Sequence, residues 1–369
     1  MATMFDYLRW RGDLSFAQDP PNGVDALIFS ALSYIQFCGH AAERPEEPVP
    51  LRDAAETFFA QEEPEKHVRV EKDLDLLLQA AMTLRFGQAK LVMYRDLLIP
   101  EQETQFAAVT FLLDDGSAFV AYRGTDNSLV GWKEDFNMSF QQTVPAQRLA
   151  QQYIREVAAE YAIPLRLGGH SKGGNLAVFA AARSAPMLQQ RILEVYNNDG
   201  PGFTKYLMGD PGYLAMVPRI KTYIPQSSVV GMLLEHEESY TVVKSHNVSL
   251  LQHDLYSWEV MGRDFITLEE ITEDSRFLDA TIKEWFADMS NQERGRLVDV
   301  MFTLLGSGGV ENTMEIFHPK NTLNYLKTLS ADENMRKVLS SEFQGLIEAA
   351  RRTRARFEEN REALEAPKE

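Results

Sequence analysis

Ser171 lies among four glycines, and this crowding points to nucleophilic chemistry. The stretch GGHSKGGNLA, residues 168–177, places it in a Gly-x-Ser-x-Gly pattern after an apolar run and before an Ala-rich helical pattern. Glycines cost stability in regular structure, so their gathering between two elements indicates a special backbone geometry. A strand followed by a sharp turn and a helix is the context of a nucleophile elbow, which exposes the serine hydroxyl. The alternative is a structural glycine-rich turn, and the flanking patterns favour the elbow.

A serine hydroxyl becomes a good nucleophile when a base removes its proton, so a histidine is expected downstream. The chain has seven histidines. Three histidines follow the last predicted parallel strand, where the base is expected: His236, His246 and His253. Of these, His253 in LLQHDLYSW is favoured and His246 is the second choice. His170 lies inside the elbow and is expected to point away from Ser171. The others are set aside because they lie before the sheet or in the C-terminal helical part: His40, His67 and His318.

The acid that would orient the histidine is expected at Asp199. In the segment YNNDGPG, residues 196–202, this aspartate comes just after the strand that follows the elbow helix. A carboxylate there could reach the imidazole. The structural alternative is an ordinary Asp-Gly turn, and Glu235 and Asp254 are the other candidate acids.

The elements that must position these residues alternate between strand and helix patterns. Strands are expected at Lys90–Tyr94, Phe106–Leu113, Ala118–Tyr122, Leu165–Leu167, Arg191–Tyr196 and Arg219–Ile224. Helices are expected at Asp25–Phe37, Asp53–Gln61, Asp73–Leu84, Ala146–Tyr161, Asn175–Arg183, Arg276–Asp288 and Asn321–Phe357. The turn at residues 114–117 makes the start of the sheet antiparallel, and the later alternation predicts parallel strands with helices on both faces.

The expected fold is therefore α/β: an α/β-hydrolase fold with a mixed, mostly parallel sheet and helices on both faces. A helical N-terminal prelude and a C-terminal helical extension are added to it. We expect two units, a hydrolase domain over residues 1–270 and a helical extension over residues 271–369. The charged end of the extension could dimerise or lie in solvent, and the sequence leaves the oligomeric state open.

Composition narrows the classes of partner. A net charge of −17 over 369 residues argues against nucleic acid or an anionic membrane surface as an electrostatic partner. The single cysteine, Cys38, cannot form an intramolecular disulfide, which favours a cytoplasmic protein. No apolar run has the length of a membrane span or the form of a signal peptide, so no transmembrane segment is expected. The residues imply neither a metal nor an organic cofactor.

A second motif gives the serine segment a family resemblance. The segment FVAYRGTDNS, residues 119–128, is followed by Trp132 and Asp135. Together with GGHSKGG it resembles the class 3 lipase family, and most closely a bacterial lipase-3-like family of unknown function. The segments FDYLRWRGDLSF, VDALIFSALSYIQF and QHD…SW also match that family, so the resemblance covers roughly Phe5 to Trp258.

The resemblance implies roles for individual residues. Ser171 would be the nucleophile, Thr125 an oxyanion-hole residue, and the backbone N–H of Lys172 the second donor. Two N–H groups aimed at a developing oxyanion contribute roughly 2.7–4 kcal/mol each. Arg123 and Asp135 are expected to hold the loop in shape rather than touch substrate, as buried ion pairs often do.

One position departs from the family pattern. Class 3 lipases carry their acid after the next strand in an Asp-x-Val-Pro-like segment, whereas residues 225–231 here read PQSSVVG, with Ser228 in place of the acid. Either Asp199 substitutes for it, or the protein works with a dyad, or catalysis is lost.

The leading hypothesis is a serine hydrolase that cleaves a lipid-like or other acyl ester through an acyl-enzyme. The alternative is a catalytically silent hydrolase-like module that binds an acyl ligand or a protein partner. Thioesterase or amidase chemistry would use the same residues, because leaving-group preference depends on pocket shape. The apolar residues between Phe203 and Met216 could form a lid or acyl pocket, although a packing role is favoured.

Overall fold

A mixed sheet of nine strands organises the chain, as seen in a computed structural model that describes residues 1–44, 46–126, 128–307 and 319–365. Of the positions discussed above, residue 127 and His318 lie outside these ranges. The strand order is β1-β2-β3-β4-β5-β6-β7-β8-β11. Their bounds are β1 Val49–Pro50, β2 Lys90–Ile99, β3 Thr104–Leu112, β4 Ala118–Tyr122, β5 Leu165–His170, β6 Ile192–Asn198, β7 Ile220–Pro225, β8 Tyr240–Val243 and β11 Thr267–Leu268. A separate ribbon pairs β9 Val260–Met261 with β10 Asp264–Phe265.

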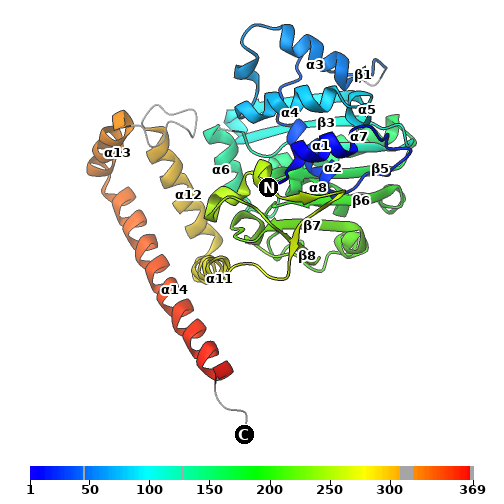
Figure 1. The fold of residues 1–369 in the computed structure, drawn as a ribbon. Helices are drawn as coiled ribbons and strands as arrows, with labels where there is room; N and C mark the ends of the chain where they lie inside the picture. Colours follow the sequence, from blue (N-terminus) through cyan, green and yellow to red (C-terminus); the bar gives the residue numbers. More distant parts are fainter. Residues whose placement is uncertain (45, 127, 308–318, 366–369) are drawn as a thin grey trace.

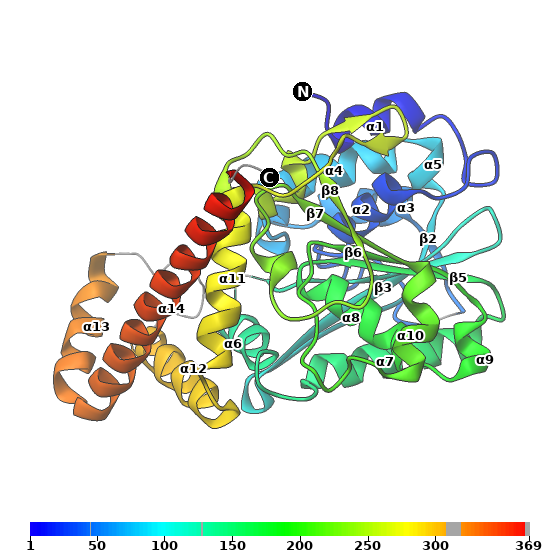
Figure 2. The same cartoon turned by 90° about the horizontal axis from the view of Figure 1, so that it is seen from below.

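Strands β4 to β8 run parallel and lie side by side in chain order, while β1 to β4 and β8 to β11 pair antiparallel. Parallel neighbours need crossover connections, and crossovers of one hand that advance in one direction place their helices on one face. The helices α7 Pro145–Glu160, α8 Lys172–Ala182 and α10 Pro211–Met216 accordingly cover the same face (Figure 2). Helix α6 Leu129–Asn137 and the short α9 Pro186–Gln189 complete these connections.

The opposite face is covered by helices that precede β2 in the chain. These are α1 Met4–Arg11, α2 Gly23–Leu32, α3 Leu51–Ala60, α4 Glu71–Ala81 and α5 Leu84–Gly87 (Figure 1). From α2, Phe29 packs on Phe111 and Phe119 of the sheet with ring centroids 4.7 and 4.8 Å apart. The predicted cover on both faces is confirmed, and the N-terminal prelude supplies half of it.

The C-terminal part, as far as the structure describes it, consists of the helices α11 Glu273–Ala287, α12 Asn291–Gly306, α13 Pro319–Ala331 and α14 Glu333–Glu365. The long α14 lies along α11, where Phe277 and Phe357 meet edge to face at 5.8 Å and Arg352 pairs with Glu284 (Figure 1). Part of the charged C-terminal helix is therefore packed and ion-paired within the chain. None of the helices in the described ranges has the length and apolar character needed to cross a membrane.

Several element boundaries differ from those expected. The strand predicted at Leu165–Leu167 extends to His170, and the helix predicted from Asn175 begins at Lys172, because the glycines that weaken both patterns are packed against neighbouring backbone. The single helix expected over residues 321–357 is broken between α13 and α14. Helix α2 ends at Leu32, and the parallel strand β8 was not predicted because a polar loop precedes its four residues.

Candidate active site

The backbone at Ser171 has the conformation of an elbow. It lies between β5 and α8 at φ 57° and ψ −132°, a region that residues with a side chain rarely occupy. A Cβ on Gly169 would lie 2.1 Å from the carbonyl carbon of Gly173, and one on Gly173 would lie 2.2 Å from the Tyr122 carbonyl oxygen. The start of α8 thus touches the ends of β4 and β5, which explains the glycines around the serine.

Asp199 and His253 are in direct contact. The carboxylate of Asp199 accepts a hydrogen bond from Nδ1 of His253 at 2.6 Å, and the aspartate side chain is fully buried. The Asp199 backbone has φ 53°, and its N–H donates to the Tyr223 carbonyl at the end of β7. Its other carboxylate oxygen accepts from the Ser228 hydroxyl and from the Gly231 N–H. The serine at the family's usual acid position therefore contacts the aspartate one strand away.

The Asp199 contact fixes the tautomer of His253. A carboxylate accepts hydrogen bonds, so Nδ1 carries the proton and Nε2 is the basic nitrogen of the neutral ring. His253 is 28% exposed, and its Nε2 makes no hydrogen bond with the described residues. The Ser171 hydroxyl likewise has no partner there. Its backbone N–H donates to the Asn198 carbonyl at 3.0 Å, which places the serine beside Asp199 at the carboxyl edge of the sheet.

The alternative base and acids lie elsewhere. His246 is exposed and Glu235 is exposed. Asp254 caps the short turn that follows it and pairs with Lys72 at 3.3 Å. Of the candidate bases and acids, His253 and Asp199 are the pair that the structure brings into contact.

His236 occupies a different network. Its Nδ1 lies 3.2 Å from the buried carboxylate of Glu238, and its Nε2 lies 3.0 Å from the Gly231 carbonyl oxygen. Both neighbours are acceptors, so this histidine braces the loop whose Gly231 N–H reaches Asp199. The sequence did not indicate this role.

The two expected oxyanion donors lie on adjoining segments. Lys172 is the first residue of α8, so its N–H has no acceptor within the helix and lies at the positive end of the helix dipole. The Thr125 hydroxyl donates to Asp135, which holds the loop after β4. A Cβ at Gly124 would lie 2.2 Å from the Tyr34 hydroxyl and 2.5 Å from the His170 carbonyl oxygen, so this loop is pressed against the elbow.

The Lys172 side chain is buried and fully engaged. Its ammonium donates to the side-chain and backbone oxygens of Gln105 at 2.8 and 3.0 Å and pairs with Glu134 at 3.2 Å. It also lies 3.6 Å from Asp135. Burial raises the pKa of Asp135 to about 6, although Lys172 and the Thr125 hydroxyl act in the opposite direction. Glu134 and Gln105 were missed by sequence reasoning; the acidic pair after Trp132 was the available signal.

Arg123 holds the same loop by another contact. It is buried, and its guanidinium forms two hydrogen bonds of 2.7 Å with the carboxylate of Asp96. Asp96 lies on β2, beyond the end expected for that strand. These contacts agree with the expectation that Arg123 and Asp135 shape the loop. Arg123 pairs with Asp96, and Asp135 contacts Thr125 and Lys172.

The loop that carries His253 is tied to the loop after β7. In the 3-10 turn Ser249–His253, the Gln252 side chain accepts from the Ser227 N–H at 2.8 Å, and the buried Trp258 indole donates to the Gln252 carbonyl. Next to the histidine, the turn leaves three apolar side chains largely exposed: Val248, Leu250 and Leu251.

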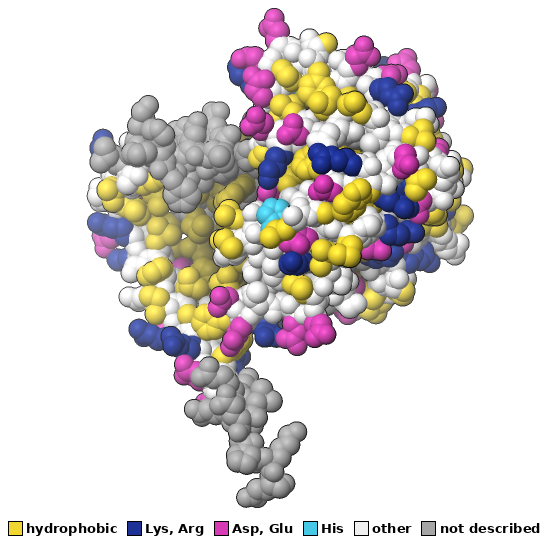
Figure 3. Space-filling view, in the orientation of Figure 1, with side chains coloured by type: hydrophobic (Ala, Val, Ile, Leu, Met, Phe, Trp, Pro, Cys, Tyr) yellow, Lys and Arg dark blue, Asp and Glu magenta, His cyan; other side chains and the backbone are white. Residues whose placement is uncertain are grey.

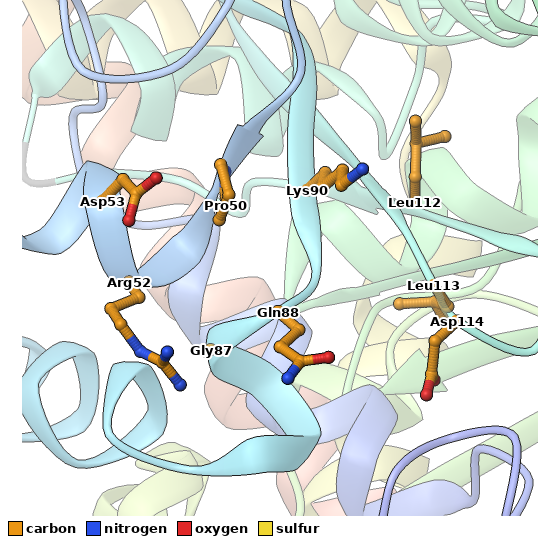
Figure 4. A pocket seen from close by; sticks show the side chains of 9 residues that line it. All are labelled: Pro50, Arg52, Asp53, Gly87, Gln88, Lys90, Leu112, Leu113 and Asp114. Atoms are coloured by element: carbon orange, nitrogen blue, oxygen red, sulfur yellow. The ribbon is translucent and has the colours of Figure 1, made fainter.

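The segment after β6 packs into the protein. Phe203, Leu207, Tyr213 and Met216 are buried in the core beside α8, as the packing interpretation of this segment predicts. A pocket of about 550 Å³ lies at the other edge of the sheet, lined by residues that include Arg52, Lys90 and Asp114 (Figure 4). Within the described residues there is no group of three His, Cys, Asp or Glu side chains that could hold a metal ion.

One family model and several solved structures are similar to this chain. A family model described as Mbeg1-like matches residues 80–303, more than half of the chain, from the end of α4 into α12. No curated protein matches the chain. Among solved structures, M37 lipase is 15% identical over 56% of this chain and 69% of its own, with a TM-score of 0.37. A triacylglycerol lipase from Penicillium expansum is 14% identical, over 48% and 76%, with a TM-score of 0.33. The Rhizomucor miehei lipase propeptide complex is 13% identical, over 59% and 67%, with a TM-score of 0.35.

Proposed function

The chain belongs to the Mbeg1-like family, and from that premise we propose that it is a serine hydrolase that cleaves an acyl ester through an acyl-enzyme. The observation that carries this proposal is the 2.6 Å contact between buried Asp199 and His253 beside the strained backbone of Ser171. A buried carboxylate that fixes an imidazole tautomer next to a serine elbow is the arrangement used for acyl transfer.

In the proposed reaction the Ser171 oxygen attacks the ester carbonyl carbon and its proton passes to Nε2 of His253. Asp199 stabilises the imidazolium that forms and keeps its ring oriented. The negative charge on the carbonyl oxygen is stabilised by the backbone N–H groups of Lys172 and Thr125. The tetrahedral intermediate collapses, the proton on His253 passes to the leaving alcohol, and the acyl group stays on Ser171. Water, activated by the same imidazole, then releases the acid.

Asp199 supplies the acid from β6 rather than β7. The Ser228 hydroxyl and the Gly231 N–H donate to its carboxylate and compensate for its burial, because a buried charge needs hydrogen-bond partners. The absence of an aspartate at Ser228 is therefore compatible with a complete triad. This weakens the sequence argument for a catalytically silent module.

The substrate class follows from the surface beside the base. Val248, Leu250 and Leu251 are 69%, 60% and 65% exposed on the turn that ends at His253. Exposed apolar groups gathered at a site favour an apolar ligand portion. An ester with a lipid-like or other apolar acyl group fits this surface.

A fluorophosphonate probe tests the proposal. The phosphorus of the probe is attacked by an activated serine, so the folded wild-type protein should be labelled at Ser171 and Ser171→Ala should not be labelled. Intact mass and peptide mapping measure the outcome. Folded wild-type protein that stays unlabelled, together with absence of ester hydrolysis, would contradict the hydrolase proposal and leave the ligand-binding module as the better explanation.

The position of the acid has its own test. Asp199→Asn keeps the size of the side chain but removes its charge, and we expect the labelling rate to fall by roughly 10²–10⁴-fold. Ser228→Ala removes one hydrogen bond to the carboxylate and should cost far less, about tenfold, the equivalent of a typical net hydrogen bond. Equal losses in the two variants would show that Asp199 is not the triad acid.

A further inference from the structure

His170 is a buried histidine that the proposed reaction does not use. It directly precedes Ser171, and its side chain faces Tyr34 and the loop that carries His253, the base loop. Its Nε2 lies 2.8 Å from the backbone carbonyl oxygen of His253, and its Nδ1 lies 2.9 Å from the hydroxyl of Tyr34. The rings of His170 and His253 lie side by side with centroids 4.5 Å apart.

The partners of His170 define its protonation. A carbonyl oxygen can only accept, so Nε2 carries a proton and donates to His253. Burial, and then the nearby His253 and Arg69, lower the pKa of His170 well below its usual range, so the ring is neutral. Nδ1 of a neutral ring with a proton on Nε2 is an acceptor, and the Tyr34 hydroxyl donates to it.

We infer that His170 is a positioning residue for His253. The Nε2–H of His170 holds the backbone of His253, and the Tyr34 hydroxyl keeps His170 in the tautomer that this contact requires. This inference rests on the proposed function. Because His253 gains a proton in the reaction, a neighbouring ring at 4.5 Å has to stay neutral to avoid repelling it. A hydrogen-bonded but uncharged histidine meets both needs.

Tyr34 extends this arrangement to the N-terminal part of the chain. It follows α2, outside the region that matches the family model, and the Arg69 guanidinium lies 4.3 Å above its ring. The base loop also contacts that part of the chain elsewhere, since the Tyr256 hydroxyl donates to buried Asp73 and Lys72 pairs with Asp254. The N-terminal helices thus hold the loop of the base as well as covering the sheet.

Two substitutions of His170 separate its donor from its bulk. His170→Gln retains an N–H donor near the position of Nε2, and we expect fluorophosphonate labelling within about threefold of wild type, whereas His170→Asn is too short to reach the His253 carbonyl. For Asn we expect a loss of roughly 10–100-fold, the scale of a misplacement of about 1 Å. His40→Asn is the matched control, because within the described residues the His40 ring hydrogen-bonds Thr57 and Gln61, away from the site, and this variant should label at the wild-type rate.

The outcomes separate this inference from the proposed function. Wild-type protein that is not labelled contradicts the proposed function, whereas labelled wild type with His170→Asn at an unchanged rate contradicts only the role of His170. If the Asn variant does not fold, ¹⁵N-histidine NMR of the wild type decides. A neutral ring protonated at Nε2 near pH 7 is expected for His170, and an imidazolium or a ring protonated at Nδ1 would overturn the inference.

Discussion

At the scale of single residues, Ser171 carries its hydroxyl on a backbone that favours glycine. Its φ of 57° persists because the ends of β5 and α8 are fixed by close packing at Gly169 and Gly173. Such strain costs about 1–3 kcal/mol and often marks a functional position. The elbow therefore holds the half-buried Ser171, the proposed nucleophile, at a cost in stability.

Because of this strain, glycine at position 171 should stabilise the protein relative to alanine, the reverse of their usual order in a helix. Ser171→Gly relieves the backbone strain at this positive φ, and Ser171→Ala does not. Glycine also raises the entropy of the unfolded chain, which offsets part of the gain. We therefore expect the glycine variant to have the larger free energy of unfolding, by about 1–2 kcal/mol. Urea denaturation of both variants measures the difference. Ser341, exposed in the middle of α14, is the control, and there alanine should be more stable than glycine by about 1 kcal/mol. A Ser171→Gly variant less stable than Ser171→Ala would contradict the strain argument.

The residues predicted from sequence were those whose types and order are set by chemistry. Ser171 follows from the glycine pattern, and Asp199 and His253 follow from the need for an acid and a base beyond later strands; the structure places the last two in contact. Their catalytic roles stay predictions. The buried partner Glu134 was missed although the acidic pair after Trp132 was a signal for it. The hydroxyl of Tyr34 could not be predicted, because it comes from a distant segment that only the folded chain brings to the elbow.

At the scale of elements, alternation predicted the parallel part of the sheet and helices on both of its faces, but not that the N-terminal helices cover one face alone. Strands β4 to β7 were expected because each has an apolar run, whereas β8 was missed after a polar loop. The helical pattern of apolar residues also continues through Asp332, so one helix was expected where the chain changes from α13 to α14. Local pattern records which residues are apolar, and tertiary contacts decide where an element ends.

Glu238 joins three elements through one carboxylate. It accepts from the Tyr213 hydroxyl of α10 at 2.6 Å, from Thr222 of β7 at 2.7 Å and from His236. Burial opposes its ionisation, but these hydrogen bonds, led by that from His236, outweigh burial and lower the pKa of Glu238 from 4.5 to about 2. The folded protein therefore keeps this group ionised at a pH where the unfolded chain protonates it.

The depressed pKa gives a stability change with a defined sign. The ionised Glu238 contributes to stability above about pH 4.5, and this contribution is lost as the pH falls through 4.5 towards 2. Glu238→Gln should therefore lower the free energy of unfolding at pH 6 by about 3 kcal/mol and by progressively less between pH 4.5 and 3. Urea denaturation at several pH values measures this, with the exposed neighbour substituted in Glu237→Gln as control. A deficit independent of pH would contradict the assignment.

At the scale of the whole molecule, the C-terminal helices reach both loops around the site. The Thr272 N–H before α11 donates to the Gln226 carbonyl at 2.7 Å, and Ser275 in its first turn donates to the Ser228 carbonyl. On the other side α12 packs on α6, which carries Asp135. Figure 3 shows hydrophobic side chains gathered over these helices where they face the body of the protein. The C-terminal helices therefore support both the loop after β7, which contacts Asp199, and helix α6, whose Asp135 holds Thr125.

The contact between α6 and α12 can be tested through one aromatic pair. Phe302 of α12 is 8% exposed and meets Phe136 of α6 edge to face at 5.7 Å, whereas Phe343 of α14 is 64% exposed. Phe302→Ala should lower the free energy of unfolding by about 3 kcal/mol, as expected for a buried phenylalanine, and Phe343→Ala should change it little. Because α6 carries Asp135, which holds the Thr125 hydroxyl, Phe302→Ala should also slow fluorophosphonate labelling of the protein that remains folded. Labelling at the wild-type rate in a destabilised Phe302→Ala protein would show that α12 stabilises the fold without shaping the loop that carries Thr125.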